Sequence, residues 1–286
     1  MTSAAAQAAG IPIPYPGFTG SVAQALRPFP QYLTITNLSN PNGDSTYHAL
    51  QMKMERRISH GLTGVVAYAW SKTLTDADNA AGGGPAGQTF YNRSLEKAVS
   101  DTDVPQAISI SFLYDLPFGP GKRFFQHGAL GKVMTGWTLT NIDQYWAGTP
   151  IVLTANDTLP LFNSTLRPNV VSGVPLEMSY SNFDPAVDRY INPAAFTVPA
   201  AFTLGSAARS YDSLRAPWNL NESIGAVKRT AINERVTVIF RAEFFNVFNR
   251  VVFGAPASNI SAANFGVVSS QSNAPRQGQM ALRLEF

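Results

Sequence analysis

The sequence contains no cysteine, few charged residues and no long apolar run. Without cysteine, neither a disulfide framework nor a thiolate metal site can form. Charged residues make up 14% of the 286 residues, against about 25% in typical soluble domains, so little charge is available for a fully hydrated surface. No stretch reaches the roughly 18 apolar residues that a transmembrane helix needs. The basic residues are scattered, so the basic stripe of a nucleic-acid-binding protein is missing.

Turn-forming and aromatic residues are abundant instead. The sequence has 22 glycines, 20 prolines and 18 phenylalanines, which favours an all-β protein with long loops. Mean hydropathy is close to zero, at −0.04, because neutral polar residues replace the missing charges. This balance is typical of a sheet with one apolar face and one uncharged polar or mixed face.

Alternating apolar and polar residues predict about eight strands. In the last stretch, Arg276–Phe286, an apolar side chain occupies every second position of the final seven residues. Eleven tilted residues rise roughly 25 Å, the height of the apolar band of a membrane barrel. Similar alternation predicts strands over Ser45–Ile58, Leu62–Thr73, Gln106–Leu116 and Val236–Phe248, and more weakly over Gln31–Leu38, Gly136–Thr154 and Trp218–Lys228.

The connections between these strands differ in length. Ser59–Gly61 and Arg229–Arg235 are short, and Pro117–Thr135 is intermediate. The long connections are Leu74–Pro105, Ala155–Pro217 and Asn249–Pro275. Bacterial outer-membrane barrels have short periplasmic turns and long extracellular loops. The pattern therefore predicts an antiparallel outer-membrane β-barrel segment whose C-terminus lies on the side of the short turns.

A soluble β-sandwich is the alternative, because alternation also describes a sheet with one hydrated face. A sandwich would more often have connections of a few residues and more charge on its outer face. A structureless connection near 60 residues also counts against a compact soluble domain.

Charged residues at four positions are candidate lumen-facing groups: Arg241, Glu243, Arg283 and Glu285. The two predicted strands that carry them should be neighbours, with all four on the lumen face. Cross-strand ion pairing is the ordinary explanation for such residues, and contact with a plug domain is the functional one.

Three aromatic residues at strand ends are expected at the lipid interface: Tyr68, Trp70 and Phe286. Outer-membrane barrels carry girdles of aromatic residues at both membrane interfaces. The partner predicted for these side chains is outer-membrane lipid.

Metal sites and catalytic sites find little support. The three histidines, His48, His60 and His127, lie far apart in sequence and lack ligand spacing. The pairs Asp76/Asp78 and Asp101/Asp103 flank one long loop and could contribute oxygen ligands to Ca²⁺, although solvated loop charges are the simpler interpretation. The sequence has no nucleophile elbow, no HExxH motif and no framed carboxylate pair. We expect no cofactor and no enzymatic activity.

Six segments, taken in order, resemble the β-barrel of Oar-like TonB-dependent receptors, which often carry a carboxypeptidase-regulatory-like domain. They are YDLPFGPGKRFF (Tyr114–Phe125), GWTLTNIDQYWAGTPIVLTA (Gly136–Ala155), RPNVVSGVPL (Arg167–Leu176), INPAAFTVP (Ile191–Pro199), NERVTVIFRAEFFNVFNRVVFG (Asn233–Gly254), and NFG (Asn264–Gly266) followed by PRQGQMALRLEF. RAEFFNVFN with the terminal aromatic strand is the most specific part. The chain departs from the family at Asp103–Ser109, where DVPQAIS replaces a basic, His-bearing segment.

The resemblance implies that residues 31–286 are the C-terminal part of a 22-stranded outer-membrane barrel, with residues 1–30 as a loop or linker. No plug, TonB box, regulatory domain or signal peptide is recognisable, so we expect the chain to lack its natural beginning. In the complete receptor the barrel would admit an unknown small ligand, with energy from TonB through the plug. Phe286 resembles the terminal signal that barrel assembly machinery recognises. The alternatives are a free-standing small outer-membrane barrel, acting as porin or anchor, and the soluble β-sandwich as a binding or adhesion module.

Overall fold

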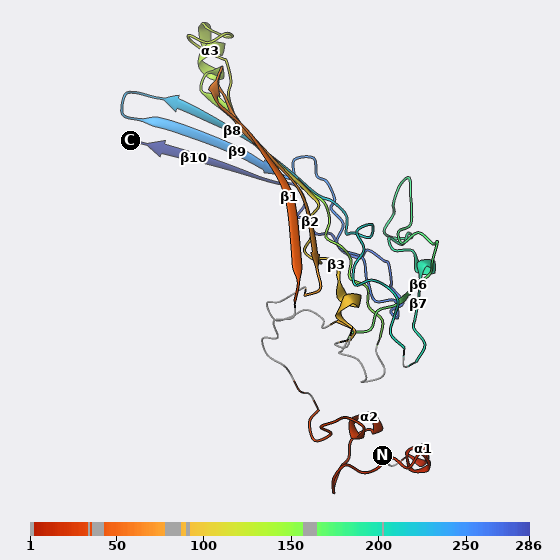
Figure 1. Ribbon diagram of the computed structural model, residues 1–286. Coiled ribbons are helices and arrows are strands. Elements are labelled where there is room, and N and C mark those ends of the chain that lie inside the picture. Colours follow the sequence, from red (N-terminus) through yellow and green to blue (C-terminus); the bar gives the residue numbers. More distant parts are fainter. Residues whose placement is uncertain are drawn as a thin grey trace.

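One open antiparallel sheet dominates the computed structural model, which describes residues 3–33, 35, 43–77, 87–89, 92–156, 165–201 and 203–286. Seven long strands follow the order β1-β2-β4-β5-β8-β9-β10, and Figure 1 shows the sheet with its edge strands β1 and β10. They are β1 (Ser45–Ser59), β2 (Leu62–Thr75), β4 (Gln106–Asp115), β5 (Trp137–Trp146), β8 (Asn219–Ala231), β9 (Thr237–Phe245) and β10 (Gln277–Glu285). The two-residue strand β3 (Ala98–Val99) also pairs with β2.

The strands confirm the alternation, with three shifted boundaries, one of them in β9, which ends at Phe245 and not at Phe248. β5 ends at Trp146 instead of running to Thr154, because the backbone then turns to pack against residues ahead of β8. At Gly148 an added Cβ would lie 1.8 Å from the carbonyl oxygen of Ala216, so only glycine permits this approach. β8 runs three residues further than expected, to Ala231. The weak strand expected at Gln31–Leu38 is not formed by residues 31–33 and 35, and its other residues lie outside the described part.

Local turn chemistry closes the two short connections. His60 and Gly61 both have positive φ, 53° and 82°, as the two-residue hairpin turn that suits strand twist requires. An added Cβ at Gly61 would also lie 2.8 Å from the Asp115 carbonyl oxygen. Between β8 and β9, the side-chain oxygen of Asn233 accepts hydrogen bonds from the backbone of Arg235 and Val236, at 2.9 and 2.8 Å.

The two ends of the sheet therefore differ, as the connection lengths predicted. Both short turns lie at the end of the sheet where β10 finishes, and we call this the turn end. The connection between β4 and β5, with helix α3 (Gly128–Met134), lies at the same end (Figure 1). The three long connections meet at the opposite end, the loop end.

The remaining elements are short. Helices α1 (Ala4–Ala8) and α2 (Val22–Ala25) lie in the N-terminal segment, beyond the loop end in Figure 1. The 3₁₀ turns η1 (Arg93–Glu96) and η2 (Pro193–Ala195), and the pair β6 (Asn169–Val170) and β7 (Phe196–Thr197), belong to the long connections. Within the described residues, no helix has the length and apolarity to cross a membrane.

The main apolar core lies outside the sheet. The described parts of the connections β2–β4, β5–β8 and β9–β10 pack together, and we call them the loop unit. A cluster of buried side chains forms its centre: Ile151, Leu153, Ile191, Ala195, Phe196, Leu214 and Phe265. The Phe196 and Phe265 rings meet edge to face at 6.0 Å between centroids. The described parts of the long loops therefore pack into one body with a shared apolar core and do not extend separately into solvent.

Candidate functional site

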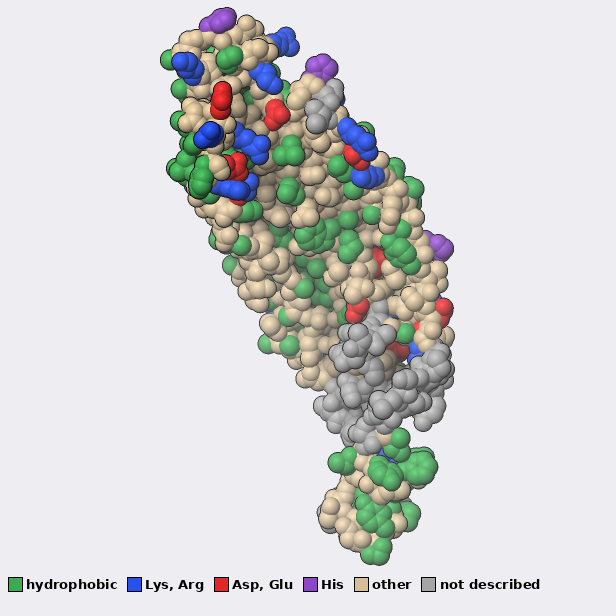
Figure 2. Space-filling model, turned by 90° about the vertical axis from the view of Figure 1, so that its left-hand side faces the viewer, with side chains coloured by type: hydrophobic (Ala, Val, Ile, Leu, Met, Phe, Trp, Pro, Cys, Tyr) green, Lys and Arg blue, Asp and Glu red, His purple; other side chains and the backbone are tan. Residues whose placement is uncertain are grey.

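Strand register divides the sheet into a polar face and an apolar face. Ser109 stands opposite Ala67 and Gln144 across β2, β4 and β5, on the polar face. One position along, Ile110 stands opposite Val66, on the apolar face. Small and uncharged polar residues dominate the first face, whereas aliphatic and aromatic residues dominate the second. In Figure 2 most charged side chains on the visible surface gather toward the turn end.

The four predicted lumen-facing charges share the polar face. In the β9–β10 register, Glu243 stands opposite Gln279 and Arg241 opposite Ala281, so neither faces an opposite charge. The expected cross-strand ion pairing is wrong. The ion pairs run along each strand instead, Arg241 to Glu243 at 3.6 Å and Arg283 to Glu285 at 3.3 Å. Across the strands, Gln279 Nε2 donates to Glu243 Oε2 at 2.6 Å.

The three predicted interface aromatics belong to the apolar face. Trp70 stands opposite Leu50 and Gln106 near the loop end and is 59% exposed. Tyr68 lies two residues closer to the turn end. Phe286 directly follows β10 on the side of Leu284 and is fully exposed at the turn end.

A second aromatic group at the turn end was not predicted. Trp137, Lys228 and Phe240 are direct neighbours across β5, β8 and β9 on the apolar face. The Trp137 and Phe240 rings meet edge to face at 6.3 Å, and Lys228 Nζ lies 5.5 Å from the Trp137 ring centroid. The Lys228 ammonium donates a hydrogen bond to the Val133 carbonyl oxygen, and an aromatic ring beside a lysine suits a membrane interface. The alternation of apolar and polar residues around Trp137 could have indicated that its ring lies on the apolar face.

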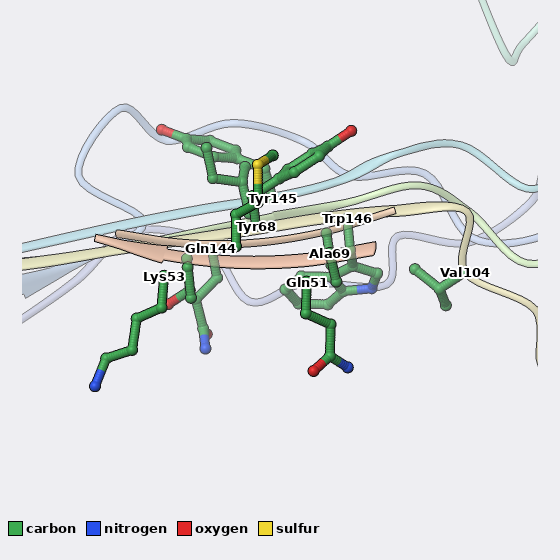
Figure 3. A pocket seen from close by; sticks show the side chains of 13 residues that line it. Gln51, Lys53, Tyr68, Ala69, Val104, Gln144, Tyr145 and Trp146 are labelled. Atoms are coloured by element: carbon green, nitrogen blue, oxygen red, sulfur yellow. The ribbon is translucent and has the colours of Figure 1, made fainter. Parts of the chain in front are cut away.

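The polar face carries an open groove of about 630 Å³. Small side chains of β2 and β4, including Ala67, Ala69 and Ser109, form its floor. Figure 3 shows Gln51, Lys53, Gln144 and Trp146 on this side of the sheet, with Tyr68 and Tyr145 on the other side. An indole ring beside two amides and an ammonium group can stack on a ring and hydrogen-bond to its substituents.

Buried polar groups tie the loop unit together. The Arg167 guanidinium pairs with Glu96 at 2.7 Å, with both side chains under 5% exposed. Arg215 pairs with the fully buried Asp103 at 2.7 Å. Charges buried in this way are costly unless each is paired and hydrogen-bonded, so these pairs fix how the connections dock on one another.

Two of the four acidic residues considered for Ca²⁺, Asp76 and Asp103, have other roles. Asp103 binds Arg215 and also accepts a hydrogen bond from the backbone of Thr73 at 2.6 Å. Asp76 pairs with Arg93 at 3.2 Å, and Asp78 lies outside the described residues. The simpler interpretation, solvated loop charges, is wrong for Asp103. Among the described residues, no group of three or more histidine or acidic side chains could hold a metal ion.

Burial changes the pKa values of two loop-unit groups. Burial raises the pKa of Glu177, although a hydrogen bond from the backbone N–H of Arg215 to the carboxylate works in the opposite direction. Burial, together with the negative charge of Glu177, raises the pKa of Tyr190 to about 12. The loop unit thus holds ionisable groups in a partly dry interior.

The tall antiparallel sheet, its two chemically distinct faces and the sorting of turns and loops define an outer-membrane β-barrel architecture. Strands of 9 to 15 residues are long enough to cross the apolar layer, which needs about 9–11 residues. The chain belongs to the outer membrane beta barrel domain family, whose family model matches residues 4–279. Its location is the bacterial outer membrane. No curated protein and no solved structure matches the chain.

Proposed function

We propose that the chain forms part of the barrel of a TonB-dependent receptor of the Oar-like type, and that the complete receptor takes up a small ligand. Family membership supports the barrel. The segments from Tyr114 to Phe286 support the finer assignment through their resemblance. The proposal gives the chain no catalytic residue.

Strand direction shows that the described strands cannot close into a barrel by themselves, and this observation carries the proposal that they are part of a larger one. β1 and β10, the two edge strands, both run from the loop end to the turn end. Direct pairing of these edges would be parallel, whereas outer-membrane barrels close with an even number of antiparallel strands. The seven described strands therefore need an odd number of further strands. A 22-stranded barrel would supply fifteen, the difference between 22 and seven, which satisfies this condition.

The surfaces suit the roles of such a receptor. The loop unit would meet the ligand first, on the outside of the cell. The groove around Trp146 would line the path through the lumen, next to the plug. The apolar face would contact outer-membrane lipid, and Phe286 would bind the barrel assembly machinery. The TonB system would act through the plug and touch none of these residues.

Nutrient uptake in the source bacterium tests the proposal. We expect deletion of the gene to abolish growth on at least one source in a panel of iron chelates and oligosaccharides. Loss of TonB should remove growth on the same source, and the double mutant should be no worse. Growth on that source that survives the loss of TonB, or a deletion defect that adds to the defect of TonB loss, would contradict TonB coupling.

A complementing gene tests the groove. Trp146→Ala should slow uptake without lowering the amount of protein in the outer membrane. Trp218→Ala is the matched control, because Trp218 lies at the loop end of β8, outside the groove residues, and is 47% exposed. Equal uptake by the two variants would remove the groove from the ligand path.

A further inference from the structure

Three neighbouring polar side chains in β5 and β8 form a cluster on the apolar face. Asp143 in β5 stands directly opposite Glu222 in β8, and Asn141 precedes Asp143 by two residues on the same face. The same row continues across the sheet as Ile110 and Val66. Both acids lie three residues from the loop end of their strands, about 10 Å along the chain. Ionisable residues on a lipid-facing surface are costly and call for a partner.

Two oxygen atoms of this cluster accept no hydrogen bond from the described part of the chain. Arg250 Nε donates to Glu222 Oε1 at 2.8 Å, and Asn141 Nδ2 donates to Asp143 Oδ1 at 2.9 Å. Within the described residues, Glu222 Oε2 and Asn141 Oδ1 have no hydrogen-bond partner. The two residues are only 2% and 7% exposed. The Tyr145 hydroxyl also interacts with the Glu222 carboxylate, although no donor among the described residues meets hydrogen-bond geometry at Oε2. Buried polar atoms without a partner are rare in folded proteins.

The charge of the cluster is also unbalanced. Two carboxylates, Asp143 and Glu222, face one guanidinium, that of Arg250, so one negative charge remains. Both unpaired atoms are oxygens that can only accept. A site with surplus negative charge and free oxygen acceptors matches a hard cation rather than an anion or a neutral ligand.

We propose that Glu222, Asp143 and Asn141 form a binding site for one calcium ion on the membrane-facing side of the barrel, near its outer rim. Glu222 Oε2, Asn141 Oδ1 and a carboxylate oxygen of Asp143 provide the protein ligands. Calcium accepts six to eight oxygens in flexible geometry, so water or the phosphate of an anionic lipid completes the shell. The site lies on the opposite face from the groove and does not depend on the proposed uptake function.

Calcium binding to the full chain, purified from outer membranes in detergent, tests the site. Equilibrium dialysis with radioactive calcium should show one saturable ion per chain. Glu222→Gln and Asp143→Asn should each weaken binding about tenfold or more, because calcium affinity depends on the number of charged ligands. Glu243→Gln, which removes a carboxylate from the opposite face of β9, should bind like the unchanged protein.

Three results would overturn the proposal. They are no saturable binding by the unchanged protein, equal binding by Asp143→Asn, and an equal loss in Glu243→Gln. Glu222→Gln keeps an oxygen for Arg250, and the strand content measured by far-UV circular dichroism identifies any variant that has lost its fold. Asn141→Leu provides a second, uncharged test, since it should weaken calcium binding while sparing the Glu222–Arg250 pair. Unchanged calcium affinity in that variant would exclude Asn141 from the shell.

Discussion

One glutamine side chain, Gln88, joins two separate backbone segments of the loop unit. Its Oε1 accepts hydrogen bonds from the backbone N–H groups of Arg167 and Gly205, at 2.9 and 3.1 Å. Its Nε2 donates to the Gly205 carbonyl oxygen at 3.0 Å. Gly205 has no room for a side chain, because an added Cβ would lie 1.8 Å from the Arg167 carbonyl oxygen. The 1% exposed amide therefore adds to the single direct backbone bond that the described residues form between these segments, from the Ala207 N–H to the Pro168 carbonyl oxygen at 3.0 Å.

Replacing Gln88 with Leu should loosen the loop unit. Each backbone group left buried and unpaired costs about 1–3 kcal/mol, so the loops should open more often while the sheet stays assembled. Limited proteolysis of intact cells measures this opening, and Gln51→Leu, at an exposed position of β1, is the control. Equal cleavage rates for the two variants would contradict the role of Gln88.

Glu177 should make the loop unit less stable at neutral pH than in mild acid. Its folded-state pKa is raised above the ordinary value of 4.5, so the folded state favours the protonated side chain. That stability is present below the unfolded pKa and is lost as pH rises through the folded pKa. Glu177→Gln should therefore resist proteolysis better than the unchanged protein at pH 7. At about pH 4 the difference should disappear. A Glu234→Gln control, in the exposed β8–β9 turn, should change neither rate.

The alternation of apolar and polar residues predicts the positions of the strands better than any other feature of the fold. β1, β2, β4, β9 and β10 appear within one to three residues of the expected bounds, because a two-sided sheet imposes a period of two on the sequence. The same period places Arg241, Glu243, Arg283 and Glu285 on one face. It does not say which charges pair, because that choice depends on sheet twist and side-chain reach.

The loop unit could not be predicted from the sequence. Its core residues, from Ile151 to Phe265, are dispersed over more than a hundred positions without a period, and glycine, proline and asparagine between them indicate only loops. Asp103 illustrates the result: beside a long loop it resembles a solvated charge, whereas the fold buries it against Arg215. The Asp143–Glu222 pair was missed for the same reason, since only the register brings the two residues together.

Adjacent positions of β4 should differ in their access to water. The chain has no cysteine, so Ser109→Cys on the polar face and Ile110→Cys on the apolar face each create a single thiol. In outer-membrane vesicles a charged maleimide should label Ser109→Cys faster, because lipid shields the apolar face from water-soluble reagents. Equal labelling, or faster labelling of Ile110→Cys, would contradict the assignment of the faces.

The end of β10 should control assembly. Phe286 adds a fully exposed aromatic side chain to the apolar row of Leu282 and Leu284. Phe286→Ala should reduce the amount of protein in the outer membrane, measured by fractionation and immunoblotting. Glu285→Ala, one residue away on the polar face, is the control and should assemble normally. Normal assembly of Phe286→Ala would show that the terminal ring is not a signal.

At the scale of the molecule, the open edges offer a test between the proposed receptor segment and a small free-standing barrel. A small barrel would need one more strand from outside the described residues. The chain refolded alone in detergent should then show no heat-modifiable gel band, because β1 and β10 keep unpaired backbone groups that favour aggregation. A folded band that shifts on boiling, with pore conductance in planar bilayers, would favour the porin alternative.

The common direction of β1 and β10 also limits how such a barrel can change size. A single added strand would leave two neighbours pointing the same way, so circumference can grow or shrink only by whole hairpins. Duplication of a unit such as β1–β2, with its two-residue turn, preserves the alternation of direction around the ring. Wider or narrower pores in engineered or natural descendants are therefore expected to differ by an even number of strands.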